Sequence, residues 1–234
     1  GVWFSMFNFN FESNRFISSG YLRCTLPEEV KREVQNTLEK IDRGDIKTSD
    51  KRKALAGHLQ KETTYPVTEK LNYLVTSLCA EYDNVFRTDF NARSHIHPNF
   101  VKEFTENGYT FEYVLRDLWI NYGKKYDFNP PHNHTGLYSF VLWVKIPYKF
   151  EDEEKVYPHV KKSHPGIFEF FFPKANTLGG IGNQTVDAVD WDLIIFPSSL
   201  AHTVYPFYTS DEERISIAGN LYFEPVKKGN KWQN

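Results

Sequence analysis

The second half of the chain, from residue 109 onward, consists of short apolar segments separated by Gly, Pro and Asn residues. The segments are rich in Phe, Tyr, Trp, Val and Ile, the residue types that favour strands. They read FEYVLRDLWINYG, LYSFVLWVKIP, GIFEFFFP, VDWDLIIFP and RISIAGNLYF. Several short strands with turn signals between them are typical of a β-sandwich or barrel. We therefore predict a β core over residues 109–226.

The amino-terminal segment predicts an edge strand. Three phenylalanines between residues 7 and 11 alternate with asparagines, as in a half-buried strand. The segment has no basic region, no small-residue cleavage site and no 18-residue apolar run, so we expect neither a signal peptide nor a membrane span. We expect residues 1–234 to form a single domain, in which residues 1–108 supply the edge strand and the supporting helices.

Two helices are expected before the β core, and we expect both to pack on its sheet. The first starts at the capping signal of Thr25 and Glu28, with Pro27 in the first turn, and ends at Gly44. The charged stretch RGDIKTSDKRK that follows predicts a solvated loop. The second helix has one apolar face, formed by Leu71, Leu74, Val75, Leu78, Tyr82 and Val85.

Charge and cysteine content exclude some classes of function. The chain has 28 Lys and Arg against 30 Asp and Glu, a formal net charge of -2, so it lacks the basic excess that binding to a phosphate backbone requires. Nucleic acid is therefore not an expected partner. Cys24 and Cys79 lie far apart in the sequence, which suits reduced thiols better than a disulfide framework. We predict a cytoplasmic protein.

Two histidines stand one residue apart in the stretch NPPHNHTG, behind a pair of prolines. Residues i and i+2 of an extended segment point to the same side, so His132 and His134 can offer two imidazoles to one metal ion. A third candidate is His202, which follows an apolar strand and the turn PSS. Three imidazoles on one side of a metal leave its other side open for substrates. The spacing predicts a metal site of His132, His134 and His202.

A cationic residue begins the last predicted strand, RISIAGNLYF. Arg214 and Ser216 share one face of this strand, whereas Ile215 and Ile217 face the other way. A guanidinium on an inward-facing position is costly unless it pairs with an anion, and its planar fork fits a carboxylate. We expect a ligand to supply that carboxylate.

The stretches INYGKKYDFNPPHNH and FPSSLAHTVYPFYTSDEERISIAGNLYF resemble the Fe(II)- and 2-oxoglutarate-dependent oxygenases of the prolyl-hydroxylase type, with phage and marine bacterial members as the nearest branch. The resemblance covers roughly residues 115–224. It implies a mainly β fold with some α structure, a double-stranded β-helix (jelly roll) core flanked by amino-terminal helices. It further implies a dioxygenase that binds Fe(II), 2-oxoglutarate and O2, converts 2-oxoglutarate to succinate and hydroxylates a substrate.

The same resemblance implies roles for individual residues. His132 and His202 would bind iron, Arg214 with Ser216 would hold the distal carboxylate of 2-oxoglutarate, and Tyr122 would touch this cosubstrate. The chain departs from the family pattern at His134, where the family has a carboxylate. A neutral imidazole there makes the iron site one unit more positive. In a second possible register, His134 would be the first ligand and Gly136 would stand at the acid position.

Two rival readings remain open. A three-histidine metal enzyme of the cupin type would not use 2-oxoglutarate and would not need Arg214 as an anchor. A binding module could keep the fold without turnover. The other histidines lie in polar segments, and we expect no ligand among them: His58, His95, His97, His159 and His164.

The substrate is left open by the sequence, between a protein side chain and a small metabolite. The charged insertion between Tyr148 and Gly166 is either a lid that reads the substrate or a solvated loop. The glycine-rich GGIGNQ at residues 179–184 predicts a turn, since the helix that follows a phosphate-binding loop is lacking. Four strand aromatics either line a pocket or belong to the core: Trp119, Phe140, Trp143 and Phe196.

Overall fold

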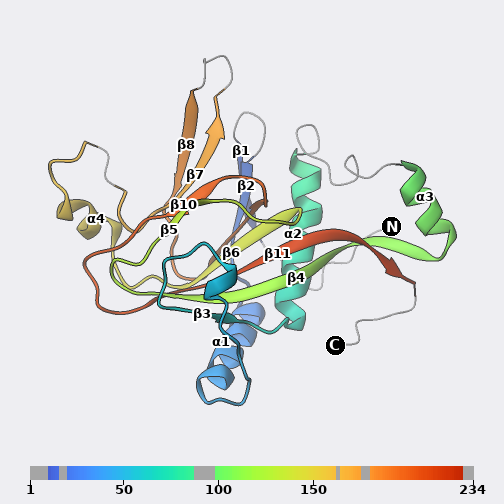
Figure 1. Cartoon of the computed structure of the whole chain (residues 1–234), viewed down its shortest axis with the longest axis horizontal. Coiled ribbons are helices and arrows are strands. Elements are labelled where there is room, and N and C mark those ends of the chain that lie inside the picture. Colours follow the sequence, from blue (N-terminus) through green and yellow to red (C-terminus); the bar gives the residue numbers. More distant parts are fainter. Residues whose placement is uncertain (1–9, 16–19, 87–97, 162–163, 175–179, 229–234) are drawn as a thin grey trace.

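The computed structural model describes residues 10–15, 20–86, 98–161, 164–174 and 180–228, and it shows two antiparallel sheets (Figure 1). The larger sheet has seven strands in the order β1-β2-β9-β6-β11-β4-β3, and the smaller has four in the order β5-β10-β7-β8. The aromatic and β-branched segments after residue 109 form the middle of both sheets, as their strand propensity predicts.

Eight consecutive strands build the core of the fold. They are β4 (Tyr109–Gly123), β5 (Asn129–His132), β6 (Tyr138–Lys145), β7 (Phe168–Pro173), β8 (Ile181–Val186), β9 (Asp192–Pro197), β10 (His202–Val204) and β11 (Arg214–Lys227). The chain passes back and forth between the sheets, because β4, β6, β9 and β11 belong to the larger one and β5, β7, β8 and β10 to the smaller. This topology is a jelly roll, which confirms the predicted fold class.

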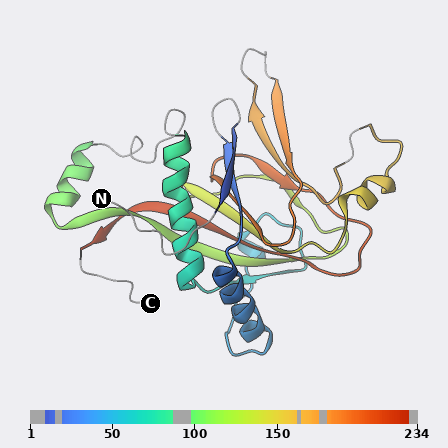
Figure 2. The ribbon, with the colours of Figure 1, turned by 180° about the vertical axis from the view of Figure 1, so that it is seen from behind.

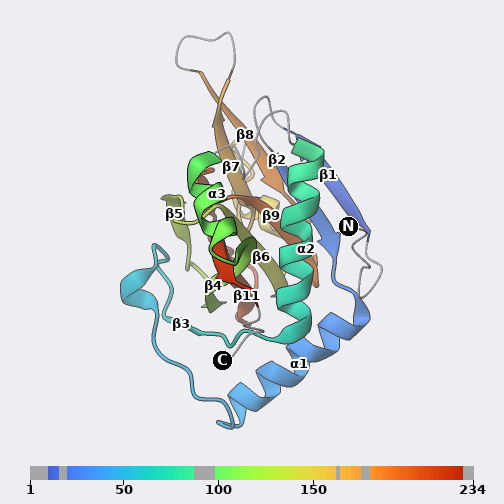
Figure 3. The same cartoon turned by 90° about the vertical axis from the view of Figure 1, so that its right-hand side faces the viewer.

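The amino-terminal elements extend and cover the larger sheet. They are β1 (Phe11–Arg15), β2 (Gly20–Thr25), α1 (Glu28–Asp42), the short 3-10 helix η1 (Arg52–Ala54), β3 (Lys61–Thr64), α2 (Glu69–Phe86) and α3 (Pro98–Glu106). Seen from behind and from the side, α2 crosses the face of the larger sheet that points away from the smaller one (Figures 2 and 3). The two predicted helices are confirmed, and β1 lies at a sheet edge; Phe7 and Phe9 lie outside the described residues.

Two apolar cores lie on opposite faces of the larger sheet. The first joins α1 and α2 to the sheet, and the fully buried Leu74, Leu78 and Tyr82 of α2 belong to it. The second lies between the sheets and contains Phe170 and Phe196. Burial on both faces explains why β9 reads as a continuous apolar run and does not alternate.

Two local predictions are wrong. Thr25 was expected to cap the first helix, but it is the last residue of β2, and Pro27 precedes α1 without a side-chain cap. Residues 181–184 of the glycine-rich stretch were expected to form a turn, but they belong to β8. They pair there with β7, and Gly182 gives room for the Phe172 ring, which a Cβ would approach to 2.4 Å.

The insertion between Tyr148 and Gly166 carries α4 (Phe150–Glu153) and a 3-10 turn, η3 (Glu154–Val156). It leaves the jelly roll on the side opposite α3 (Figure 1). Among the described residues, no helix is long and apolar enough to cross a membrane.

Candidate metal centre and the adjoining cavity

A cavity lies between the two sheets. The inner face of the larger sheet forms its floor, where cross-strand partners stand in rows. One such row runs across four strands, from Trp143 through Ser216 and Asn121 to Glu62. The complete lining is Leu55, Ala56, Leu59, Glu62, Trp119, Asn121, Gly123, Asn129, His132, His134, Val141, Trp143, Phe168, His202, Val204, Arg214, Ser216 and Ala218.

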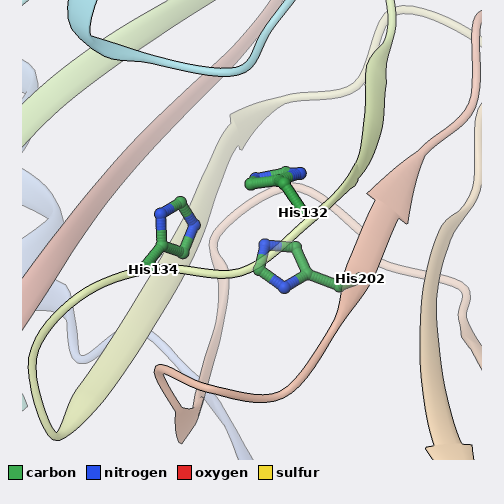
Figure 4. Close-up of side chains that lie close together, drawn as sticks. All are labelled: His132, His134 and His202. Carbon is green, nitrogen blue, oxygen red and sulfur yellow. The ribbon is translucent and has the colours of Figure 1, made fainter.

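Three histidines meet in this cavity (Figure 4). His132 ends β5 and His202 begins β10, and the two residues are direct partners in the antiparallel pair of these strands. Opposite residues of such a pair have Cβ atoms about 5 Å apart, so the pairing alone brings the two imidazoles together. His134 follows two residues later, and its backbone N–H donates to the carbonyl of Ser198. This bond fixes the chain beyond the end of β5.

The three imidazoles are close enough to share one ion. The ring centroids lie 4.3 Å apart for His132 and His202, 4.9 Å for His132 and His134, and 5.0 Å for His134 and His202. One nitrogen of each ring lies within 4.8 Å of the corresponding nitrogens of the other two. The smaller sheet and the loop after β5 thus assemble the cluster that the sequence predicted.

Backbone carbonyls orient two of the rings. Nδ1 of His132 lies 2.7 Å from the Pro130 carbonyl oxygen, and Nδ1 of His202 lies 2.9 Å from that of Leu200. Since a carbonyl only accepts, each Nδ1 must carry the proton and donate it. Nε2 of both rings then has a free lone pair, the arrangement typical of metal-binding histidines.

Burial keeps these imidazoles neutral. Desolvation lowers the pKa of His132, and together with the neighbouring His132 it lowers the pKa of His134 to about 4. His202 is 2% exposed, and its pKa falls well below the usual value, first through burial and then through the two other histidines. Imidazoles that are neutral near pH 7 have a lone pair free to bind a metal ion, whereas protonated imidazoles would repel it.

The donor set fits a divalent transition metal. Imidazole nitrogen suits Fe, Zn, Cu and Ni, whereas Mg and Ca prefer oxygen. Among the described residues, the cluster contains three histidines and no carboxylate. His132 belongs to it, which favours the register with His132 as the first ligand. Gly136, the acid position of the alternative register, lies in a turn with φ +102° beside the Leu221 carbonyl.

Arg214 lies at another part of the cavity wall and is 5% exposed. Its Nη1 donates to the Tyr148 hydroxyl at 3.0 Å and to the Tyr205 carbonyl at 3.3 Å. The guanidinium also lies over the Phe207 ring, 5.4 Å from its centroid. No carboxylate forms an ion pair with Arg214 within the described part of the chain. Neutral partners therefore hold the guanidinium in place and leave its charge uncompensated.

The structure brings Ser216 to the cavity but not Tyr122. Ser216 lies two residues after Arg214 on the same face of β11, and its hydroxyl accepts a hydrogen bond of 3.2 Å from Asn121. Tyr122 is the neighbour of Asn121 on β4 and therefore points to the opposite face. There it belongs to the core under α2, and Lys61 Nζ lies 3.8 Å from its ring centroid.

Two residues of the cavity region were missed by sequence reasoning. Tyr148 connects Arg214 to the insertion, because its hydroxyl accepts from Arg214 and donates to the Gly166 carbonyl at 2.6 Å. Glu62 lines the cavity from β3, in a charged stretch that looks like surface. Of the four aromatics, Trp119 and Trp143 line the cavity, whereas Phe140 and Phe196 belong to the two cores.

The remaining histidines lie elsewhere. His58 packs on Phe128, with ring centroids 4.6 Å apart, and His164 lies 6.2 Å from the Tyr205 ring. His159 is exposed, and His95 and His97 lie outside the described residues. Fold and site together define a jelly-roll protein with a three-histidine cluster suited to a metal ion.

Sequence comparison finds a family match for the part of the chain that contains the cavity residues. Residues 117–220, from β4 to β11, match the family described as "Putative 2OG-Fe(II) oxygenase". This span contains all three clustered histidines as well as Arg214 and Ser216. The match over this part of the chain indicates an oxidoreductase of the 2OG-Fe(II) oxygenase type, a family that uses Fe(II), 2-oxoglutarate and O2. No curated protein matches the chain in sequence.

Solved structures with a similar fold include a prolyl-4-hydroxylase from Pseudomonas putida, with 16% identity and a TM-score of 0.45, covering 91% of this chain and 95% of that one. A prolyl hydroxylase from Trichoplax adhaerens, solved with a hypoxia inducible factor peptide, has 11% identity and a TM-score of 0.46, covering 87% and 82%. A 2OG-Fe(II) oxygenase family oxidoreductase from Burkholderia pseudomallei has 16% identity and a TM-score of 0.41, covering 86% and 85%.

Proposed function

We propose that His132, His134 and His202 hold the Fe(II) of this oxygenase and that Arg214 with Ser216 holds the distal carboxylate of 2-oxoglutarate, so that the protein hydroxylates a substrate bound in the same cavity. One observation carries the proposal. The cavity contains three neutral imidazoles with converging nitrogens and, at a different part of its wall, a buried guanidinium without a carboxylate partner. A metal ion and an organic dianion complement these two features.

The residues of the chain bind and orient, while the cofactor supplies the redox chemistry. When bound, Fe(II) with 2-oxoglutarate and O2 provides oxidising power that no side chain has. Arg214 offers a charge-assisted contact to a carboxylate, and Tyr148, Tyr205 and Phe207 fix the direction of its guanidinium. Phe168 stacks on His202 at 5.1 Å between centroids and 12° between planes, which keeps water from that side of the cluster.

Arg214 also weighs against the main rival. A three-histidine enzyme of the cupin type that does not use 2-oxoglutarate has no need of a carboxylate anchor. A buried guanidinium without a counter-ion costs stability, so its presence favours an anionic ligand. The match of residues 117–220 to the oxygenase family supports the same choice.

The metal part of the proposal can be tested with His202→Ala. The parent protein should bind about one Fe(II) under anaerobic conditions and, with 2-oxoglutarate and O2, should form succinate. His202→Ala removes a ligand whose strand partner, His132, cannot replace it, so iron binding and succinate formation should both be lost. His164→Ala is the matched control and should keep both iron binding and succinate formation. Unchanged iron binding in His202→Ala would refute the assignment.

We further propose that the substrate is a protein side chain or a small metabolite and not a nucleic acid, since the chain has a net charge of -2. We place the protein in the cytoplasm because both cysteines are buried and free. Thiol titration of the denatured protein should give two free thiols per chain. An oxidised cysteine pair in protein isolated from its natural cell would contradict this placement.

A further inference from the structure

Glu62 is a buried carboxylate in the wall of the cavity. It lies on β3 and is 1% exposed, in a segment outside the family match. Gly57 covers it so closely that a Cβ at that position would lie 2.6 Å from Glu62 Oε1 and 2.8 Å from Asn129 Nδ2. The segment before β3 thus folds over the carboxylate and closes it off from solvent.

Three side-chain acceptor atoms at Glu62 and its neighbour Asn121 have no donor within the described part of the chain. Both carboxylate oxygens of Glu62 and the Oδ1 of Asn121 are buried without a hydrogen-bond partner. The two residues are direct cross-strand partners and line the same cavity. Unpaired buried acceptors cost folding free energy, so three of them facing one cavity indicate a ligand that brings donors.

The charges nearby favour a cationic ligand. Burial raises the pKa of Glu62, and the nearby carboxylates of Asp50 and Asp127 add to this rise. Arg52, the cation that opposes this rise, is exposed and already paired with Asp50. Asp127 accepts the backbone N–H of Lys124 at 2.9 Å. The potential at the Glu62 end of the cavity is therefore negative.

The cavity that holds Glu62 and the histidine cluster also has apolar lining residues. Trp119 lies two residues before Asn121 on the same face of β4, about 7 Å along the strand. Its ring lies 5.6 Å from the His134 ring, centroid to centroid. Leu55 and Leu59 close the cavity from the segment before β3. These three side chains offer an apolar surface to the alkyl part of a ligand.

We propose that Glu62 and Asn121 recognise the cationic head of the substrate, an ammonium or guanidinium group, whose alkyl stem lies along Leu55, Leu59 and Trp119 toward the three histidines. This inference rests on the proposed function, because it names the substrate class of the same cavity. Glu62 acts by binding and positioning. It lies outside the group of side chains that approach one another closely enough to share a metal ion.

The test uses small probes of matched length: n-pentylammonium, n-butylguanidinium, 1-pentanol and pentanoate. Each is titrated calorimetrically into the full chain loaded anaerobically with Fe(II) and 2-oxoglutarate. The two cations should bind at least about tenfold more tightly than the alcohol and the acid, because a charge-assisted bond forms in a buried site. Glu62→Gln, which keeps shape and removes charge, should abolish this preference. Glu112→Gln, at an exposed position of β4, should preserve it.

Several outcomes would overturn the inference: cations that do not bind, an alcohol or acid that binds equally well, or a preference that survives in Glu62→Gln. Its failure can be told apart from that of the proposed function. Loading is followed by the visible absorption band of a 2-oxo acid bound to Fe(II), and a parent protein without this band contradicts the proposed function itself. Glu62→Gln should melt no lower than the parent in the absence of probe, which separates lost recognition from lost folding.

Discussion

At position 134 an imidazole stands where the resemblance to oxygenases of the prolyl-hydroxylase type implies a carboxylate. The change removes one negative charge from the proposed metal site and leaves three neutral donors. Desolvation opposes any charge on these rings and holds the pKa of His134 at about 4. The loop after β5 is fixed by the bond from the His134 N–H to Ser198, so a shorter side chain there would still face the same cavity.

We therefore predict that His134→Asp binds Fe(II) at least as tightly as the parent, since it restores two histidines and a carboxylate. His134→Ala should weaken binding by about tenfold or more because a ligand is lost. Anaerobic titration with Fe(II) measures both. Parent-like affinity in His134→Ala would show that His134 is not a ligand.

The raised pKa of Glu62 predicts that the stability of the protein depends on pH. Burial, followed by Asp50, raises its pKa to about 7, with Arg52 opposing and Asp127 adding to the shift. The folded protein then binds a proton that the unfolded chain releases near its ordinary value of 4.5. The contribution of Glu62 to stability must fall as pH rises from about 4.5 to about 7 and stay constant above. The total loss is at most about 3 kcal/mol.

Urea unfolding of the metal-free protein at pH 5 and pH 8 tests this sign. The difference in unfolding free energy between Glu62→Gln and the parent should favour the variant at pH 8 and shrink or reverse at pH 5. Glu112→Gln controls for charge removal in general. A difference that does not change with pH would contradict the buried, unpaired state of Glu62.

The predictability of individual residues depended on their local pattern. Three residues could be recognised from the sequence because each is a polar residue at the end of a predicted strand: His132, His202 and Arg214. The resemblance implied that Tyr122 touches the cosubstrate, but Tyr122 does not line the cavity. Side chains of β4 alternate between the two faces of the sheet, so that Trp119, Asn121 and Gly123 line the cavity and Tyr122 belongs to the core on the other face. Glu62 had no signal at all. The stretch QKETTY is typical of a surface, and only the covering segment around Gly57 makes it interior.

At the scale of elements, the insertion between Tyr148 and Gly166 contacts Arg214, the residue proposed to hold the cosubstrate. Its two ends meet at Arg214 through the Tyr148 hydroxyl. Its middle is anchored by Glu153, which is fully buried and accepts the backbone N–H groups of Tyr208 and Thr209 at 2.7 and 2.8 Å. These bonds connect the insertion to the chain between β10 and β11.

Glu153→Ala should leave these two buried donors without an acceptor and cost about 2–3 kcal/mol of unfolding free energy. Hydrogen exchange should rise at residues 205–209 and in the insertion. Glu151→Ala, at an exposed position of the same helix, should change stability by less than about 0.5 kcal/mol. Equal stability of the two variants would contradict an anchoring role.

Helices and strands with a clear hydrophobic period in their sequence could be predicted. Strands that form only because they pair with a neighbouring strand could not. The apolar face of α2 and the strands of the jelly roll follow from spacing alone. β8 did not, because Gly182 and Asn183 are typical of turns and the strand forms by pairing with β7. The three-residue β10 was not predictable either. It is too short to show a pattern of its own and is a strand because it pairs with β5 and β7.

At the scale of the molecule, the amino-terminal helices and the jelly roll share one core. Leu74 and Leu78 of α2 belong to the same buried cluster as Ile120 of β4 and Ile217 of β11. We propose that residues 1–234 form a single folding domain, since neither part could expose its side of this cluster to water without a large cost.

Far-UV circular dichroism, which reports the helices, and tryptophan fluorescence, which includes the buried Trp119 and Trp143, should therefore follow one urea transition. Leu78→Ala should shift both signals together by about 2–5 kcal/mol. Val67→Ala, at a side chain that is 36% exposed, should shift them by less than about 0.5 kcal/mol. Two separate transitions would contradict the single domain.

The most direct measurement is an anaerobic titration of the Fe(II) protein with 2-oxoglutarate, followed by the visible band of the bound 2-oxo acid. The parent should show a saturable band. Arg214→Ala should keep its iron and lose about 2 kcal/mol or more of 2-oxoglutarate binding, at least about thirtyfold in midpoint. Arg116→Ala, an exposed arginine of β4, should match the parent. A parent without a band, or an Arg214→Ala variant with the parent's midpoint, would contradict the proposed cosubstrate site.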